Sequence, residues 1–401
     1  MKKTYSLPTY TLLTGFFLTG LLLLASTLYA RQQKSTVFES GADGYASYRI
    51  PAMVKLKNGH LIAFAEGRVD GAGDFGNVDI VYKTSTDSGQ TWSPLHIAVD
   101  YEKFQAGNPA PVVDLLDPRY PEGRLLLFYN TGDNHESEVR RGNGLREAWF
   151  ISSTDQGQSW SDPVNITSSV HRPKQPDRNP VYNFEEDWRA YANTPGQGMQ
   201  FVRGSYAGRI FIAANHSAGD PKPNGRDYQA HGYYTDDHGQ TFHLAPSIPF
   251  PGGNESMAAQ ISDEGLYMNS RNQQGNVKSR IVSYSSDGGT SWDTTYYDLQ
   301  LPDPVNQGST VSIPIAGGNF LLAFCNTADT LARNNLTLRL SKDGGKTWFF
   351  NKLIAAAPKD YEGSSYAAYS DLVFIRPDEI GVLYEYDRYR QIVFERIRVL
   401  F

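Results

Sequence analysis

The chain has 401 residues, of which 43 are acidic and 37 basic, and its formal net charge is −6 at pH 7. This acidic balance argues against a nucleic acid as the partner, although a local cluster of arginines can still hold a small anion. The single cysteine, Cys325, excludes an intramolecular disulfide, and its apolar surroundings predict a small buried residue. The eight histidines show no metal-ligand spacing, so we expect neither a metal nor an organic cofactor.

The first thirty residues differ in character from the rest. Lys2 and Lys3 precede an apolar run over residues 12–24, and small and neutral residues lead to Ala30. This pattern is typical of a secretory signal, so we expect export to the periplasm, the cell surface or the medium. Removal of residues 1–30 takes away two lysines and no acids, which changes the charge from −6 to −8. A retained anchor is the alternative, but the run is short for a membrane-spanning helix, and no stable membrane insertion is expected.

An eight-residue phrase then recurs five times along the chain. The first copy reads Ser-Thr-Asp-Ser-Gly-Gln-Thr-Trp, and the others keep the Asp, the Gly two positions later and a final aromatic residue. The copies lie at residues 85–92, 153–160, 235–242, 285–292 and 341–348. Asp hydrogen-bonds the backbone of its own turn, and Gly allows the turn's unusual φ. Intervals of roughly 50 to 80 residues suit one four-stranded blade per repeat, which predicts an all-β propeller domain over residues 31–401.

Three charged residues accompany the first predicted strands. Arg49 lies in the motif Tyr-Arg-Ile-Pro, Arg68 follows nineteen residues later, and Asp74 lies in the glycine-rich loop Gly-Asp-Phe-Gly-Asn. With these motifs the chain resembles bacterial-type exo-α-sialidases, which have six-bladed propellers, except that Tyr48 stands where that family usually has Phe. The resemblance covers roughly residues 48–385. The recurring phrase is similar to the family's Asp box, which also occurs in unrelated secreted proteins and so supports the fold more than the function.

The resemblance implies a substrate that ends in sialic acid, whose carboxylate the enzyme must hold. Arginine holds such a group through bidentate, charge-assisted hydrogen bonds. The family uses three arginines, which match Arg49, Arg271 in Leu-Tyr-Met-Asn-Ser-Arg and Arg333 in Arg-Asn-Asn-Leu-Thr-Leu-Arg. Arg339, at the end of the last motif, is the alternative to Arg333, but its place on a predicted strand favours a direction away from the site.

The family's nucleophile is a tyrosine, since a carboxylate would be repelled by the anionic sugar. The match is Tyr369, in Ala-Ala-Tyr-Ser-Asp-Leu, and Tyr366 is its competitor. An unperturbed tyrosine has a pKa of about 10 and therefore needs a base nearby. Glu255, sixteen residues before Arg271, matches the family's glutamate in that role.

One further carboxyl group must protonate the leaving oxygen and later activate water. Asp74 matches it, with Asp70 and Asp79 as alternatives, and Glu385 matches a residue that orients the first arginine. Two other residues are expected to line the pocket near the ring substituents of the sugar, Arg68 and Asn108.

Together these residues predict a retaining exo-α-sialidase that releases terminal sialic acid from glycoproteins, glycolipids and oligosaccharides. Its covalent intermediate would form on tyrosine. A trans-sialidase, which transfers the sugar to a galactose acceptor, would share the same catalytic residues and stays open. A propeller that binds sialosides without cleaving them is a third interpretation, against which the joint presence of Tyr369, Glu255 and Asp74 argues. The sequence leaves linkage preference and oligomeric state open.

Overall fold

The computed structural model describes residue 1 and residues 34–399. The expected signal at residues 1–30 therefore lies outside the described residues, apart from residue 1. The described chain is an all-β propeller with only single turns of helix, so the predicted fold class is confirmed at that level. Among the residues that the structure describes, no helix has the length and apolar character needed to span a bilayer.

Two of the sheets are antiparallel meanders of four strands in chain order. The first consists of β15 (Gly253–Gln260), β16 (Leu266–Asn272), β17 (Ser279–Ser285) and β18 (Thr294–Pro302). The second consists of β19 (Gly308–Pro314), β20 (Phe320–Thr327), β21 (Leu336–Ser341) and β22 (Phe350–Ala355).

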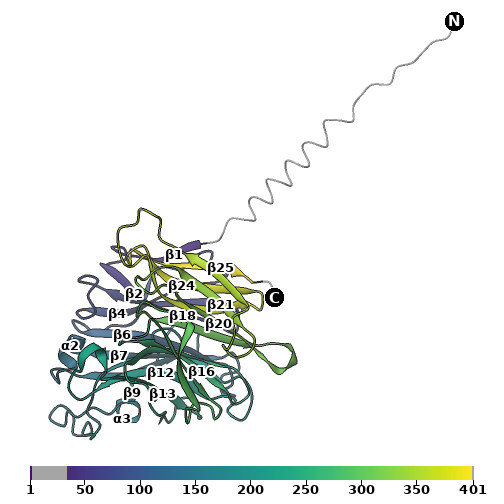
Figure 1. The fold of residues 1–401 in the computed structure, drawn as a ribbon. Coiled ribbons are helices and arrows are strands. Elements are labelled where there is room, and N and C mark those ends of the chain that lie inside the picture. Colours follow the sequence, from purple (N-terminus) through teal and green to yellow (C-terminus); the bar gives the residue numbers. More distant parts are fainter. Residues whose placement is uncertain (2–33, 400–401) are drawn as a thin grey trace.

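A third sheet joins both ends of the described chain. It contains β23 (Ala367–Arg376), β24 (Glu379–Tyr386) and β25 (Gln391–Arg398), and its fourth strand is β1 (Lys34–Glu39). The purple β1 and the yellow β25 lie side by side in Figure 1, and they pair antiparallel. This pairing closes the propeller.

The remaining described strands fall into two sheets. One contains β10 (Trp188–Asn193), β12 (Ile210–Ala218), β13 (Tyr228–Thr235) and β14 (His243–Leu244), with β11 (Met199–Gln200) beside β12. The other has eight strands: β2 (Ser47–Lys55), β3 (Leu61–Arg68), β4 (Val78–Ser85), β5 (His96–Val99), β6 (Gln105–Asp114), β7 (Arg124–Gly132), β8 (Arg146–Ser153) and β9 (Val164–Asn165). The described residues thus form five hydrogen-bonded sheets where the sequence predicted six blades. The physical reason is one parallel pair, Val78 with Gln105, which links β4 to β6.

Burial falls from the first strand of a meander to the last. All but the final residue of β2 is buried, whereas β9 is exposed and β18 is mostly exposed or half-buried. The first strands also contact one another, β2 with β6 and β23, and β19 with β15 and β23. They therefore surround the centre of the propeller, and the last strands face solvent. The helical turns are α2 (Glu136–Val139), α3 (Thr167–Val170), η1 (Pro223–Gly225) and η2 (Ala316–Gly318).

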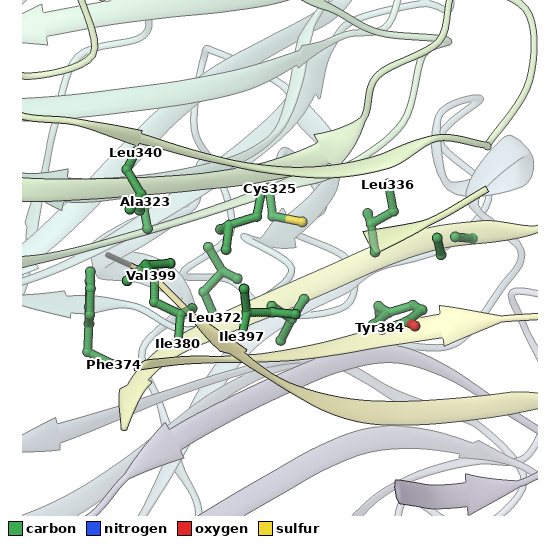
Figure 2. Close-up of a cluster of buried hydrophobic side chains, with 14 of the residues drawn as sticks. Ala323, Cys325, Leu336, Leu340, Leu372, Phe374, Ile380, Tyr384, Ile397 and Val399 are labelled. Atoms are coloured by element: carbon green, nitrogen blue, oxygen red, sulfur yellow. The ribbon is translucent and has the colours of Figure 1, made fainter. Parts of the chain in front are cut away.

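The core lies between neighbouring sheets. Figure 2 shows one such cluster, in which Leu340 and Cys325 of one sheet meet Leu372, Ile380 and Ile397 of the next. Cys325 is fully buried there, as predicted, and burial raises the pKa of its thiol to about 12. Removal of this apolar surface from water stabilises the packing of one sheet on the next.

The five recurring turns share one hydrogen-bonding pattern. In residues 285–292, Ser285 Oγ donates to Asp287 Oδ1 at 2.7 Å, and the same oxygen accepts from the backbone N–H of Ser291 at 2.9 Å. Asp287 Oδ2 accepts from Ser291 Oγ at 2.6 Å. The other four turns repeat these contacts. Three of the final aromatic rings contact a ring in a neighbouring meander: Trp92 meets Phe394, Trp160 meets Phe64 and Phe242 meets Phe128.

Candidate active site

Four strands that begin a meander share an irregularity at one end. The pairing register shifts on β2 between Arg49 and Ala52, on β6 between Gly107 and Ala110, on β15 between Gly253 and Ser256, and on β23 between Ala367 and Ser370. Such bulges re-aim side chains and are frequent beside active sites. Four residues predicted from the sequence to belong to the site lie at or within these shifts: Arg49, Asn108, Glu255 and Tyr369.

Tyr369, Glu255 and Arg271 form one hydrogen-bonded cluster. The Tyr369 hydroxyl donates to Glu255 Oε1 at 2.6 Å, and Arg271 Nη1 donates to both Glu255 Oε2 at 2.8 Å and the Tyr369 oxygen at 2.9 Å. Burial, and then the charge of Glu255, raise the pKa of Tyr369 far above that of a free tyrosine, against the opposing charge of the arginines. The hydroxyl is therefore protonated at neutral pH, and a carboxylate oxygen of Glu255 accepts its hydrogen bond.

Arg49 is held by Glu385, a fully buried residue of β24. Arg49 Nε donates to Glu385 Oε1 at 2.7 Å, and the same oxygen accepts from the backbone N–H of Ile50 at 3.0 Å. Ile50 has a φ of 58°, which is rare for a β-branched residue. Glu385 Oε2 accepts from the backbone N–H of Tyr369 at 3.3 Å. One carboxylate therefore fixes Arg49 and the strand that carries Tyr369.

The three predicted arginines converge on Tyr369. The guanidinium carbons of Arg49 and Arg333 each lie 5.5 Å from the centre of its ring, and Arg271 bonds its hydroxyl. Arg339, the alternative to Arg333, instead donates to Asn326 Oδ1 at 2.8 Å within its own sheet. The structure thus brings Arg333, and not Arg339, to this cluster.

Asp74 and Arg68 form a second group. Arg68 Nη1 donates to Asp74 Oδ1 at 2.7 Å, and Arg68 Nη2 donates to Glu66 Oε2 at 2.6 Å. Arg68 is buried, whereas the side chain of Asp74 is 71% exposed. Desolvation alone would raise the pKa of Asp74, but the charge and hydrogen bond of Arg68, helped by the charge of Arg49, hold the pKa below its ordinary range. The alternative Asp79 is buried and accepts from the Tyr45 hydroxyl at 2.7 Å.

Two residues of this region were not predicted from the sequence, Glu66 and Tyr389. Glu66 Oε1 accepts from the backbone N–H of Asn108 at 2.9 Å, so that Glu66 joins Arg68 to the β6 bulge. Tyr389 lies over Arg49 and accepts from Arg333 Nη1 at 2.9 Å. Among 25 tyrosines, nothing in its local sequence singles out Tyr389.

One group of described residues has the spacing of metal ligands, namely Asp114, Asp117 and His238. Arg124 Nη2 lies 3.7 Å from a carboxylate oxygen of each aspartate, and Arg119 pairs with Asp117 at 2.7 Å. These guanidinium groups already supply positive charge to both carboxylates.

Residues 59–376 match the profile of a protein family described as the BNR repeat-like domain. The chain is 29% identical over 377 residues to a sialidase of Micromonospora viridifaciens, which covers 89% of this chain and 52% of that protein. It is 27% identical over 373 residues to a sialidase of Paraclostridium sordellii, which covers 88% of this chain and 85% of that protein. Among solved structures, the Hadza microbial sialidase Hz136 has a TM-score of 0.73 at 25% identity, over 91% of this chain and 68% of that chain. The chain thus spans about half the length of the Micromonospora protein.

Proposed function

The chain belongs to the family of BNR repeat-like domains, and on this premise we propose that it is a retaining exo-α-sialidase. Its substrates are glycoproteins, glycolipids and oligosaccharides that end in sialic acid. The observation that carries the proposal is the cluster of Tyr369, Glu255 and Arg271, with Arg49 and Arg333 beside the tyrosine ring. Sialidases among the relatives support the same activity.

Arg49, Arg271 and Arg333 hold the carboxylate of the sugar. Each guanidinium offers a planar fork of donors that matches a carboxylate. Because the anion sits on the anomeric carbon, a fixed carboxylate also places that carbon for attack. Glu385 keeps Arg49 in place through its 2.7 Å ion pair.

Tyr369 then attacks the anomeric carbon while Glu255 takes its proton. The raised pKa of Tyr369 means that the hydroxyl stays neutral until the reaction begins, so it does not repel the anionic sugar. The Arg271 contact to the tyrosine oxygen stabilises the negative charge that develops there. The product is a covalent sugar–tyrosine intermediate, the route by which sialidases depart from other glycosidases.

Asp74 protonates the leaving oxygen and later deprotonates the attacking water. Its exposed side chain is accessible to an entering glycoside. In the free protein Arg68 keeps the pKa of Asp74 low, so the acid role requires that pKa to rise when the substrate binds. An anion held by the arginines and the exclusion of water both act in that direction. Asn108 and Arg68 would contact the ring substituents of the sugar in this proposal.

The architecture that supports this site is a propeller of six blades. In this interpretation the eight-stranded sheet is two blades, since one bridge alone links its two meanders. The five recurring turns are Asp boxes and lie away from the catalytic residues. Residues 1–30 act as a secretory signal, and residues 31–401 form the catalytic domain.

The experiment is to incubate the purified protein with a fluorogenic α-sialoside, with and without lactose, and to identify the products. Release of free sialic acid as the α-anomer first is expected of a retaining hydrolase. Formation of sialyl-lactose at the expense of free sugar would identify a trans-sialidase instead. Binding without any release would identify a sialoside-binding propeller.

A further inference from the structure

The turn between β24 and β25 has a strained backbone. Asp387, Arg388 and Tyr389 have φ values of 47°, 55° and 64°, three successive left-handed residues without a glycine. Such a conformation is costly for a residue with a side chain and persists only where the surroundings enforce it. The backbone N–H groups of Asp387 and Arg388 donate to the carbonyls of Tyr366 and Ser365, at 2.8 Å and 3.0 Å. Strain of this kind often accompanies a functional constraint, which directs attention to where the turn places its side chains.

The strained turn places Tyr389 between two of the three arginines. The centre of its ring lies 3.9 Å from the guanidinium carbon of Arg49. Its hydroxyl accepts from Arg333 Nη1 at 2.9 Å and donates to Ser365 Oγ at 3.0 Å. One side chain therefore contacts Arg49 through its ring and Arg333 through its oxygen.

The arginines differ in how their charges are compensated. Arg271 is paired with Glu255 and Arg49 with Glu385, at 2.8 Å and 2.7 Å. Within residues 34–399, no ion pair to a carboxylate is found for Arg333, whose guanidinium is oriented by the tyrosine hydroxyl. A neutral partner fixes the direction of a guanidinium without cancelling its charge. The uncompensated charge then remains available to an incoming anion.

Arg49 gains from the same side chain in a different way. Glu385 occupies the Nε edge of its guanidinium, and the ring of Tyr389 lies against the group. A cation over an aromatic face is attracted by the ring's electrons, more strongly where water is excluded. Both contacts restrict rotation of the guanidinium and leave its terminal nitrogens as the donors for a ligand.

We propose that Tyr389 is a positioning residue of this site, a neutral partner that orients Arg333 and Arg49 for one carboxylate and leaves the charge of Arg333 uncompensated. This inference rests on the proposed sialidase function, since the carboxylate is that of the sugar. A site arranged in this way should bind an anionic sugar acid more tightly than the neutral amide of the same sugar.

The test compares Tyr389→Phe and Tyr389→Leu with a matched control, Tyr366→Phe. Phenylalanine keeps the ring against Arg49 and removes the oxygen that Arg333 needs, whereas leucine removes both. Tyr366 carries a hydroxyl of similar burial that bonds Tyr386 at 2.8 Å instead of an arginine. The measurements are kcat and KM with a fluorogenic α-sialoside. Calorimetry adds the Kd of an unsaturated sialic acid analogue and of its carboxamide.

We expect Tyr389→Phe to raise KM and the Kd of the acid by about 10-fold, because a hydrogen bond to a charged group is lost. In Tyr389→Phe the Kd of the carboxamide should change by less than about twofold, and kcat should change by less than KM. Tyr389→Leu should weaken binding of the acid further. Tyr366→Phe should match the unaltered protein. Thermal unfolding checks that each variant is folded. If the leucine variant does not fold, Tyr389→Phe, which keeps the ring, is sufficient to test the proposal.

Two outcomes would contradict the proposal separately. An active protein in which Tyr389→Phe leaves KM and the acid-to-carboxamide ratio unchanged would remove Tyr389 from this role while the sialidase function stands. An unaltered protein that neither cleaves a sialoside nor binds the acid would reject the proposed function itself, and the role of Tyr389 with it.

Discussion

The hydroxyl of Tyr369 lies 2.6 Å from Oε1 of Glu255, although the two residues are 114 positions apart in the chain. They come from β23 and β15, which do not pair with each other, and each stands at a bulge in its own strand. The short contact joins a buried tyrosine hydroxyl to a carboxylate oxygen that accepts its hydrogen bond. Bulges are the local devices that bring the two side chains together.

Replacement of Tyr369 by phenylalanine removes the proposed nucleophile and leaves the ring in place. We expect kcat with a fluorogenic α-sialoside to fall by at least about a thousandfold, as for other lost nucleophiles. With a ring-fluorinated sialosyl fluoride, the unaltered protein should accumulate an adduct that peptide mapping places on Tyr369. The control is Tyr366→Phe, since the Tyr366 hydroxyl bonds Tyr386 and lies outside the cluster. An adduct on Tyr366 or on a carboxylate would reassign the nucleophile.

Replacement of Arg271 by lysine keeps a positive charge and loses the planar fork. Lysine cannot bond the Glu255 carboxylate and the Tyr369 oxygen with the same geometry as Arg271 Nη1. We expect kcat/KM to fall by at least about 10-fold, which corresponds to about 1.4 kcal/mol. Arg376→Lys is a control, because Arg376 is half exposed and pairs with Glu379 away from the cluster. Equal kinetics for both variants would remove Arg271 from the site.

The recurring turns should contribute to stability and not to catalysis. Asp287→Ala removes the acceptor for Ser285 Oγ, for the backbone of Ser291 and for Ser291 Oγ. We expect the free energy of unfolding in urea to fall by about 2 kcal/mol, with KM unchanged in the folded protein. Asp293→Ala, at an exposed position just after the same turn, should have little effect. A changed KM without a change in stability would place the turn at the site instead.

A buried histidine should make the fold sensitive to acid. His171 is packed against Tyr191 with ring centres 4.5 Å apart, and neither of its ring nitrogens has a hydrogen-bond partner among the described residues. Burial, together with the charges of His231 and Arg172, lowers the pKa of His171 well below its ordinary value. Below about pH 6.5 the unfolded chain therefore takes up a proton at this position that the native protein does not.

Because the unfolded state then binds more protons, stability is present above pH 6.5 and is lost as the pH falls. His171→Phe keeps a ring of similar shape and removes this titration. We expect its unfolding free energy to equal or exceed that of the unaltered protein at pH 7.5. The difference in unfolding free energy between His171→Phe and the unaltered protein should then grow by about 1.4 kcal/mol for each pH unit below 6.5. Urea unfolding at pH 7.5, 6.5 and 5.5 measures this difference, and curves that stay parallel would contradict it.

The residues that could be predicted from the sequence are those with a recognisable local context. Arg49 precedes Ile-Pro, and Tyr369 lies in Tyr-Ser-Asp-Leu, so the local sequence alone predicts each as a site residue. The recurring phrase predicted the turns for the same reason, since its Asp and its Gly act within eight residues.

Residues whose partners come from distant segments could not be predicted in this way. Tyr389 meets Arg333 across 56 positions, and only the left-handed turn after β24 brings them together. Glu66 depends on the bulge at Asn108, 42 positions away. Two meanders likewise join into one sheet through a single pair, Val78 and Gln105. No periodicity in the sequence predicts that pair.

The closing pair of β1 and β25 has a consequence for how the protein is made. Within residues 34–399, β1 is the first strand to be synthesised, and it can pair with β25 only after residue 391 has been made. At the usual 5–20 residues per second, that delay is roughly 20 to 70 seconds. Throughout that time β1 lacks the strand that it pairs with, and unpaired strand edges are where chains aggregate. Lys34 and Glu39, the charged residues at its two ends, are of the kind that discourages such contacts. The ring therefore cannot close before residue 391 is present, and until then β1 depends on other means of protection.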